Sequence, residues 1–392
     1  MSNSTAQIAD PADSGAWEMP EQFVMLRDTI RRFMREEVQP IEERQPHDAW
    51  ALPSADLQAL RAKARAAGLW CLASPAEYGG GGLGLLGQVV VAEEAAKCRM
   101  GAYVPACGAF GIDPPSVIWL GTPQQRQTYG VAGIEGGKKN FVAISEAAGG
   151  SDPARKIETR ARREGDAYVI TGTKLWITAA DKADWGIVFA RTDAGITAFI
   201  VDRDTPGITC REIGVIRSYA PYEVHFDDVR VPAENMLGED GKGFAICQKW
   251  LVHARVPYSA AVIGIAQAAL QIAIDHARQR HVHKSLLADK QAVQWMIADS
   301  EIELRAARLL TYQAAWSGDL GRDIKTEASI AKVVATETAG RVVDRCIQIL
   351  GGMGVAREMP LERWYRELRI KRIGEGPSEV HRMVLARELL RS

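Results

Sequence analysis

The chain has 392 residues, a length that predicts two or three domains of roughly 150 residues around a sizeable core. Apolar residues make up 47% and charged residues 25%, which excludes wholesale disorder and collagen-like or fibrous sequences. The 48 Lys and Arg nearly balance the 49 Asp and Glu, so the net charge of -1 gives no general attraction for nucleic acid or for an anionic membrane, and neither partner is expected.

Cysteine usage and the start of the chain bear on location. Six cysteines are scattered without a C-x-x-C pair, which argues against a zinc site and a disulfide framework and favours a reducing, cytoplasmic location. Apolar runs such as residues 83–92 stop well short of the roughly 20 residues that span a bilayer, so a soluble protein is expected. Residues 1–17 resemble neither a signal peptide nor a transit peptide, and we interpret them as a disordered lead-in.

Residues 18–140 have the periodicity of an N-terminal all-helical domain. From Pro20 onwards apolar residues recur at steps of three and four, which places them on one face of a helix: Phe23, Leu26, Ile30 and Phe33. Glycine and proline separate this helix from further helical stretches at residues 54–67, 85–97 and 124–129.

Around Asn140 the pattern changes to short segments rich in β-branched and aromatic residues, which predicts a middle antiparallel β domain over residues 141–243. Helical periodicity then returns in long stretches typical of a C-terminal four-helix-bundle domain over residues 244–392. The resulting architecture is α+β, without the alternating βαβ order of a doubly wound nucleotide-binding fold. The predicted strands are residues 141–144, 167–170, 174–178, 185–191, 197–201 and 223–226, and the predicted helices are residues 244–280, 287–317, 324–350 and one after Pro377.

Two motifs are set aside. The glycines of residues 79–84 match the dinucleotide fingerprint G-x-G-x-x-G, but Pro75 breaks any preceding strand and acidic residues follow after about ten positions rather than about twenty. We therefore interpret this segment as a tight loop between helices. His281 and His283 lack a third ligand nearby, so a helix end is favoured there and no metal is expected.

Three segments combine glycine with polar residues in a way that a plain core does not need. Residues 143–152 lead from a strand into a glycine turn whose N–H groups and hydroxyls suit an anionic or carbonyl-rich ligand. In the next segment, strand alternation places Lys174, Trp176 and Thr178 on one face, where ring and hydroxyl would line a flat aromatic cofactor.

The third segment comprises residues 348–354 and 369–381. Glu375 lies there between two glycines, which allow close approach of the backbone to a ligand and leave the carboxylate free to project. Glu375 is therefore the best candidate for a general base in the sequence.

Taken in order within an α, β, α chain, these segments resemble the acyl-CoA dehydrogenase family, from about Pro20 to Arg391. Residues 145–152 are similar to the family signature T-E-x-x-A-G-S-D, with Ser145 for threonine, Ala147 for proline and Gly149 for alanine. The K-x-W-I-T strand is matched without change by residues 174–178. The motifs F-x-D-V-x-V-P, Q-x-x-G-G-x-G and I-Y-E-G-T-S-E-I-Q-R are similar to residues 226–232, 348–354 and 373–382.

The resemblance implies a flavoenzyme with FAD at a dimer interface, assembled as a homodimer or homotetramer, with Glu375 as the catalytic base. It implies substrate contacts from Ser151, Arg255, Gly374 and Gly376. The residues implied to bind FAD are Ser145, Ser151, Trp176, Thr178, Arg280, Gln348, Gly351, Gly352, Pro377 and Glu379, of which Arg280, Gln348, Gly351 and Gly352 would reach the neighbouring subunit's cofactor.

In the implied reaction Glu375 takes the α-proton of an acyl-CoA thioester and flavin N5 takes the β-hydride. The products are a trans-2-enoyl-CoA and a reduced flavin that passes its electrons to an electron-transfer flavoprotein. Burial of Glu375 against flavin and substrate is expected to raise its pKa, so that it accepts a proton near neutral pH. Hydrogen bonds from the ribityl hydroxyl and the N–H of Glu375 would stabilise the developing enolate.

The chain also departs from the family pattern. Gly374 stands where tyrosine is usual, and the missing ring is expected to open volume for a bulky, branched, cyclic or hydroxylated acyl group. Pro377 replaces a threonine, His283 a phenylalanine and Val252 an acidic residue, at positions that normally help to bind FAD or CoA. The alternatives are an acyl-CoA oxidase that uses dioxygen, a flavin monooxygenase, against which the retained base argues, and a flavin-less binding or assembly protein.

Overall fold

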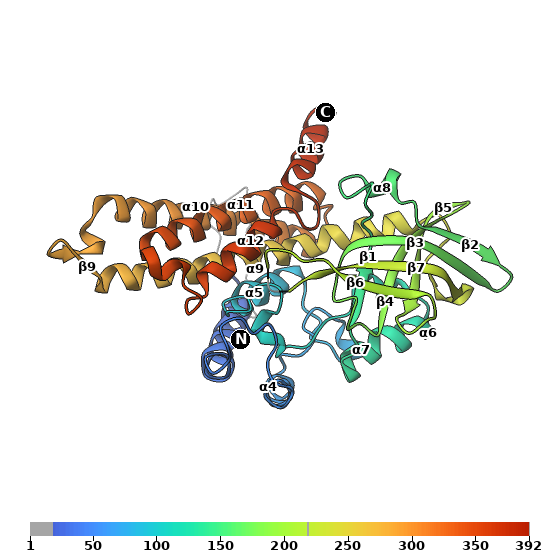
Figure 1. Ribbon diagram of the computed structural model, residues 1–392, viewed down its shortest axis with the longest axis horizontal. Helices are drawn as coiled ribbons and strands as arrows, with labels where there is room; N and C mark the ends of the chain where they lie inside the picture. Colours follow the sequence, from blue (N-terminus) through green and yellow to red (C-terminus); the bar gives the residue numbers. More distant parts are fainter. Residues whose placement is uncertain (1–18, 218, 392) are drawn as a thin grey trace, which may run out of the picture.

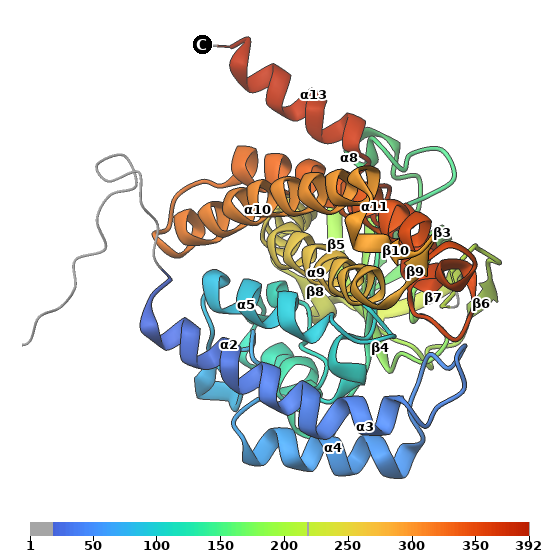
Figure 2. The same cartoon turned by 90° about the vertical axis from the view of Figure 1, so that its left-hand side faces the viewer.

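The computed structural model describes residues 19–217 and 219–391, so the expected lead-in at residues 1–17 lies outside the described residues. A helical part, a β-sheet and a second helical part follow one another along the chain, as the sequence predicts. In Figure 1 the sheet lies at one end of the molecule and the long helices of the last part extend away from it. Figure 2 shows the first helices packed along one side of these long helices.

The N-terminal part confirms the amphipathic helix predicted after Pro20. Ile30 and Phe33 are buried in the N-terminal core, and the helix continues through a π-helical turn at residues 34–38. Residues 79–84 form a loop that packs tightly against residues 72–74, and no strand precedes it within residues 19–78, which confirms the loop interpretation. The helices of this part are α2 (Glu21–Phe33), α3 (Gln39–Glu42), α4 (Ser54–Ala66), α5 (Leu85–Ala95), α6 (Pro123–Gln125) and α7 (Ala132–Gly136).

The middle part is an eight-stranded sheet in the order β6-β7-β3-β2-β4-β5-β8, with β1 paired to β4. Most pairs are antiparallel as predicted, but β1 and β2 each run parallel to β4, so the sheet is mixed. The two strands predicted at residues 167–170 and 174–178 form one bulged strand. The bounds are β1 (Asn140–Ala143), β2 (Arg160–Glu164), β3 (Ala167–Thr178), β4 (Trp185–Thr192), β5 (Gly195–Asp202), β6 (Ile208–Glu212), β7 (Pro221–Pro232) and β8 (Met236–Leu237), with a short helix α8 (Pro153–Lys156).

The C-terminal part contains three long helices and two shorter ones. The bundle consists of α9, α10, α11 and α12, and sequence analysis missed α12, whose Leu361, Trp364 and Leu368 nevertheless form a buried stripe in the shared core. Figure 2 shows the last helix, α13, projecting from this body. The bounds are α9 (Gly243–Gln279), α10 (Gln291–Asp319), α11 (Lys325–Leu350), α12 (Leu361–Lys371) and α13 (Ser378–Leu389).

Helix α9 connects the three parts. At Gly243 it lies on β5 so closely that a side chain would overlap Thr197, and at Gly264 a side chain would overlap the carbonyl of Glu93 in α5. Among the described helices α9 alone is long and apolar enough to cross a membrane, yet most of its apolar stretch is buried against α5, α10 and α11. Its 37 residues place its far end about 55 Å from the sheet.

Candidate active site

Glu375 lies on the loop between α12 and α13, in a backbone conformation that few side chains adopt. Its φ is +56°, in the left-handed region, and the following Gly376 has φ +95°. Such a conformation costs a non-glycine residue about 1–2 kcal/mol. Strain of this kind persists only where the surroundings hold the backbone in place, and it is common at functional sites.

Two cations from the long helices hold this loop by its backbone carbonyls. Arg255 of α9 donates from Nε to the carbonyl oxygen of Glu375 at 3.0 Å. Lys332 of α11 donates from Nζ to the carbonyl oxygens of Arg372 at 3.0 Å and Gly376 at 2.6 Å. The loop is therefore fixed from the bundle, and the Glu375 side chain takes no part in its anchoring. Arg255 was expected to contact substrate, and in the structure it positions the Glu375 backbone.

The Glu375 carboxyl group is set up to accept a proton. Its Oε2 is buried and has no hydrogen-bond partner among residues 19–217 and 219–391. Burial raises the pKa of Glu375, while the positive charges of Lys371, Arg255 and Lys332 act in the opposite direction. A carboxylate that is desolvated without a hydrogen bond is a stronger base than one in water, as the sequence analysis expected.

The hydroxyl of Tyr258 lies in the direction that a side chain at position 374 would take. A Cβ built at Gly374 would lie 3.0 Å from the hydroxyl oxygen of Tyr258 in α9. That hydroxyl donates to the carbonyl oxygen of Lys371 at 3.0 Å, which fixes the ring beside the Glu375 loop. A side chain at position 374 would therefore meet the Tyr258 hydroxyl, and the preference for a bulky acyl group stays a prediction.

Strand β3 presents an exposed tryptophan at its bulge. Trp176 has φ +66° and is 55% exposed, and Thr178 is also exposed. Strand alternation predicted that Lys174 shares their face, and this is wrong. The bulge between Lys174 and Ile177 reverses the alternation, so Lys174 points into the interior. The indole and hydroxyl still lie on one open face of the strand.

Lys174 forms a buried ion pair with Glu146 that sequence analysis did not find. Its Nζ donates to Oε1 of Glu146 at 2.7 Å and to the carbonyl oxygen of Ile144 at 3.0 Å. Glu146 also accepts the backbone N–H groups of Glu158 and Thr159, at 2.6 and 3.1 Å. Burial lowers the pKa of Lys174 to about 8, against the attraction of Glu146. The pair fixes the start of the 145–152 turn against β3.

The turn itself presents polar groups to solvent. The carbonyl oxygen of Ser145 accepts the N–H of Leu175 at 2.8 Å, which joins the turn to β3 beside Trp176. Ser151 is exposed at the far side of the turn. Across the site Pro377 occupies the N-cap position of α13 and Glu379 is exposed in its first turn.

The four residues expected to serve a neighbouring subunit lie at the other end of the bundle. Arg280 ends α9, about 55 Å from the sheet by helix length, and it is exposed. Gln348, Gly351 and Gly352 are exposed at the end of α11. Helix α11 returns to the end of the bundle where α9 finishes, and where Figure 1 shows the short hairpin of β9 (His281–Val282) and β10 (Ser285–Leu286). Within one chain these residues cannot meet Trp176 or Ser151, so a shared cofactor site requires a second chain.

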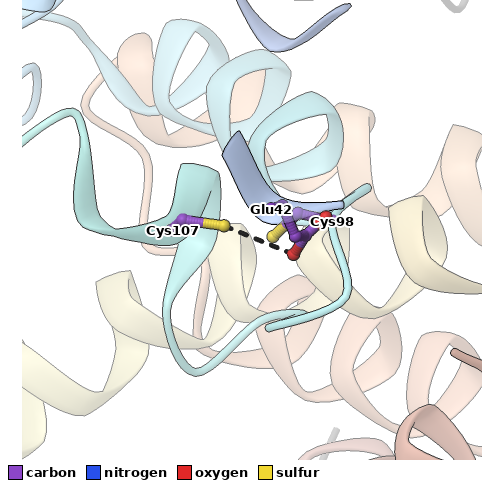
Figure 3. Close-up of side chains that lie close together, drawn as sticks. All are labelled: Glu42, Cys98 and Cys107. Carbon is purple, nitrogen blue, oxygen red and sulfur yellow. Dashed lines mark hydrogen bonds between the residues drawn. The ribbon is translucent and has the colours of Figure 1, made fainter. Parts of the chain in front are cut away.

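A thiol cluster in the N-terminal part was not predicted. Figure 3 shows Glu42 of α3 beside Cys98 and Cys107, with ligand atoms within 4.8 Å of one another. Cys107 donates from Sγ to Oε1 of Glu42 at 3.3 Å, and the N–H of Met100 donates to the same oxygen at 3.2 Å. Contact with Cys98 and burial raise the pKa of Cys107 strongly. A protonated Cys107 thiol that donates a hydrogen bond to Glu42 accounts for this cluster.

The comparisons with known proteins identify the family. The acyl-CoA dehydrogenase N-terminal, middle and C-terminal domain families match residues 20–136, 142–229 and 241–390. The chain belongs to the acyl-CoA dehydrogenase family and is an FAD-dependent oxidoreductase.

Three relatives illustrate the likeness. The short-chain specific acyl-CoA dehydrogenase of Rattus norvegicus is 38% identical over 96% of this chain and 92% of its own length. Butyryl-CoA dehydrogenase from Megasphaera elsdenii is 30% identical over 96% of this chain and 100% of its own, with a TM-score of 0.83. A glutaryl-CoA dehydrogenase from Mycobacterium smegmatis in complex with FADH2 is 25% identical over 95% of this chain and 96% of its own, with a TM-score of 0.84.

The residues present suit the FAD that this family uses. A large aromatic ring that is 55% exposed at a strand bulge, Trp176, is unusual in a core-facing sheet and suits contact with a planar ring system. Ser151 and Thr178 are also exposed, and their hydroxyls are able to donate hydrogen bonds to a cofactor. The buried Oε2 of Glu375 has no hydrogen-bond partner among the described residues and so is available to a ligand.

Proposed function

We propose that this chain catalyses the α,β-dehydrogenation of an acyl-CoA thioester, with Glu375 as the base that accepts the α-proton. The observation that carries this proposal is the Glu375 loop, whose strained backbone is held by Arg255 and Lys332 while the buried Oε2 of Glu375 has no hydrogen-bond partner within residues 19–217 and 219–391. When bound, FAD accepts the hydride that leaves the β-carbon. Relatives named for short-chain, butyryl-CoA and glutaryl-CoA substrates support a short acyl group.

The physical demand on Glu375 is to remove a weakly acidic α-proton. A base whose pKa is raised by burial is matched to this task near neutral pH, and general-base catalysis of this kind contributes about 10²–10⁴ in rate. Arg255 keeps the carboxyl group in place through the Glu375 carbonyl oxygen, and the backbone N–H of Glu375 is proposed to donate to the thioester oxygen as negative charge develops there. Trp176 and Thr178 are proposed to orient the cofactor.

The partners proposed for this reaction are an electron-transfer flavoprotein and a second copy of this chain. The separation of Arg280 and Gln348 from Trp176 along α9 and α11 supports a dimer at least, because both groups of proposed FAD contacts are needed for one site. Ser145, Pro377 and Glu379 are proposed to complete the cofactor contacts, and Gly376 and Ser151 to lie against substrate. The cytoplasmic location remains a prediction from composition.

The test of Glu375 is anaerobic reduction of the bound flavin. Wild-type protein is mixed with butyryl-CoA and the flavin absorbance is followed. Glu375→Gln is expected to keep its yellow cofactor, but the rate of flavin bleaching should fall by at least about 10²-fold. Glu388→Gln, on an exposed position of α13, is the matched control and should bleach like the wild type. Bleaching that persists in Glu375→Gln contradicts the assignment, and rapid peroxide release in air would favour the oxidase.

A further inference from the structure

The thiol cluster of the N-terminal part brings together three side chains that can bind a metal and that the proposed reaction does not use. Glu42 comes from α3, Cys98 from the segment after α5, and Cys107 from the 3₁₀ segment Pro105–Gly108. Figure 3 shows the two sulfur atoms beside the carboxylate of Glu42. The sequence has no C-x-x-C pair and the three ligands come from separate segments, so no local motif reports them.

The spacing of the three ligand atoms suits one zinc ion. Zinc binds tetrahedrally with Zn–S bonds of about 2.3 Å and Zn–O bonds of about 2.0–2.2 Å, so its ligand atoms lie roughly 3.6–3.8 Å apart. Sγ of Cys107 lies 3.3 Å from Oε1 of Glu42, and all three ligand atoms lie within 4.8 Å of one another. Side-chain movements of well under 1 Å or about that size would therefore bring Cys98, Cys107 and Glu42 to the bond lengths of one ion.

The chemistry of the donors selects the metal. Two sulfur atoms exclude calcium and magnesium, which take oxygen ligands. The carboxylate of Glu42 distinguishes the set from the all-sulfur sites that copper(I) favours. Zinc binds cysteine sulfur and carboxylate oxygen alike, and three protein ligands leave its fourth position to water. Zinc is therefore the metal that this donor set fits best.

The charge of a zinc-loaded cluster has a partner nearby. Two thiolates, one carboxylate and Zn²⁺ leave one negative charge, which is costly to bury alone, and Cys98 and Cys107 are 3% and 1% exposed. Arg363 of α12, itself 7% exposed, lies close enough for the charges of Cys98 and Glu42 to act on its guanidinium. Glu367 acts on the same guanidinium but has further cations around it. Arg363 can therefore balance the loaded site.

A cavity gives an ion access to the cluster. Glu42 and Cys98 line a cavity of about 650 Å³ bordered by α2, α3, α5 and α9. Arg35 and Glu43 also line it and are exposed, so the cavity reaches the surface of the chain. Water in this cavity can fill the fourth position of a tetrahedral ion.

We propose that Glu42, Cys98 and Cys107 bind one zinc ion, with a water molecule from the cavity as the fourth ligand. Binding forms two Zn–S bonds and one Zn–O bond to the protein, the two thiol protons pass to solvent, and no electron is transferred. Without the metal, the hydrogen bond from Cys107 to Glu42 holds the cluster. None of the three ligands takes part in the proposed reaction, so this inference does not depend on it.

The ion acts as a structural tie within the N-terminal part. It connects α3 to the segment after α5 and to residues 105–108. Ala106 and Cys107 both have left-handed backbone conformations, with φ +49° and +53°, and such strain persists only where the surroundings hold it. A bond from the ion to Cys107 fixes this strained segment. Zinc is therefore expected to stabilise the folded chain.

The test uses cobalt(II) as a spectroscopic substitute for zinc in the flavin-loaded, thiol-reduced protein. Wild-type protein is expected to bind one cobalt ion per chain, with red d–d bands beyond the flavin absorbance and a sulfur-to-metal charge-transfer band, and to lose both on addition of zinc. Cys98→Ser and Cys107→Ser should each weaken metal affinity by more than the roughly 10–100-fold that an outer-shell substitution costs. Cys346→Ala, another fully buried cysteine, is the matched control and should keep the wild-type spectrum.

Urea unfolding gives a second measurement. Zinc should raise the urea midpoint of the wild type and of Cys346→Ala, and should leave that of Cys107→Ser unchanged. Circular dichroism and flavin content check that the serine variants fold, and the wild-type spectrum needs no variant.

Three results would overturn the site. The first is a wild-type protein that binds cobalt without a thiolate band, as the exposed His281 and His283 can do, or that binds none. The second is a thiolate band that persists in both serine variants. The third is a wild-type urea midpoint that saturating zinc leaves unchanged.

Discussion

Replacing Lys174 by methionine tests how the site is held together. Lys174 is fully buried, and its Nζ is bonded to Glu146 and to the carbonyl oxygen of Ile144. Removal of the ammonium leaves the carboxylate of Glu146 buried with only backbone N–H partners. Breaking one side of a buried ion pair in this way costs about 3–5 kcal/mol. We therefore expect Lys174→Met to destabilise the sheet by about that amount and to weaken FAD binding through the 145–152 turn.

A neighbouring strand offers a matched control. Arg162 and Glu164 on β2 form an ion pair with an N–O distance of 2.6 Å, similar to that between Lys174 and Glu146, but their side chains are 74% and 43% exposed. Exposed pairs contribute about 0.2–1 kcal/mol, so Arg162→Met should shift the urea midpoint much less than Lys174→Met. The assay follows urea unfolding of the flavin-loaded protein by tryptophan fluorescence and circular dichroism.

A double mutant isolates the pair itself. Glu146→Gln alone should also destabilise, because it leaves the Lys174 ammonium buried without a counter-charge. The double variant should cost less than the sum of the two single variants, with a coupling energy of about 1–3 kcal/mol. Equal midpoints for Lys174→Met and Arg162→Met, or strict additivity in the cycle, would refute this account of the turn.

Three further predictions concern the catalytic loop and the cofactor face. Burial raises the pKa of Glu375 and only its ionised form is a base, so kcat/KM should rise with pH through that pKa. Lys371→Met removes the largest opposing charge and should therefore move this pH profile to higher pH. Stopped-flow measurement of flavin reduction across roughly pH 5–9 tests this, and a shift to lower pH would contradict it. Gly374→Tyr should slow flavin reduction at least about tenfold because the added ring meets the Tyr258 hydroxyl. Adding Tyr258→Val to this variant should restore part of the rate, and a double variant that is no faster than Gly374→Tyr alone would refute the steric explanation. Trp176→Ala should weaken FAD binding by about 0.5–1.5 kcal/mol or more, read by equilibrium dialysis, and unchanged affinity would show that the exposed ring does not contact the cofactor.

The three-part architecture could be predicted because its signals are local. The long helices α9, α10 and α11 carry sustained helical periodicity, and the change to short β-branched segments near Asn140 marks the sheet. The short helix α12 was missed because its three buried apolar residues are separated by charged ones. The parallel pairing of β1 with β4 depends on a connection through β2 and β3 that no local pattern reports.

Several features of the candidate site depend on contacts that local sequence patterns do not report. Glu375 was found because two glycines flank it, whereas the inward turn of Lys174 depends on a bulge that alternation alone cannot anticipate. The buried Glu146 lay within a recognised motif, and its role follows only from the position of Lys174 across the turn. The hydroxyl of Tyr258 lies beside Gly374 although the two residues are 116 positions apart in the sequence, so only the packing of α9 against the loop reveals this contact.

The most direct test of the central claim is a structure of the protein with FAD and a non-oxidisable acyl-CoA analogue. The account predicts that the Glu375 carboxylate lies about 3–3.5 Å from the α-carbon of the bound thioester, on the side of the acyl group opposite the flavin ring. A carboxylate directed away from the α-carbon, or a thioester bound with its α-carbon beyond reach of Glu375, would contradict it.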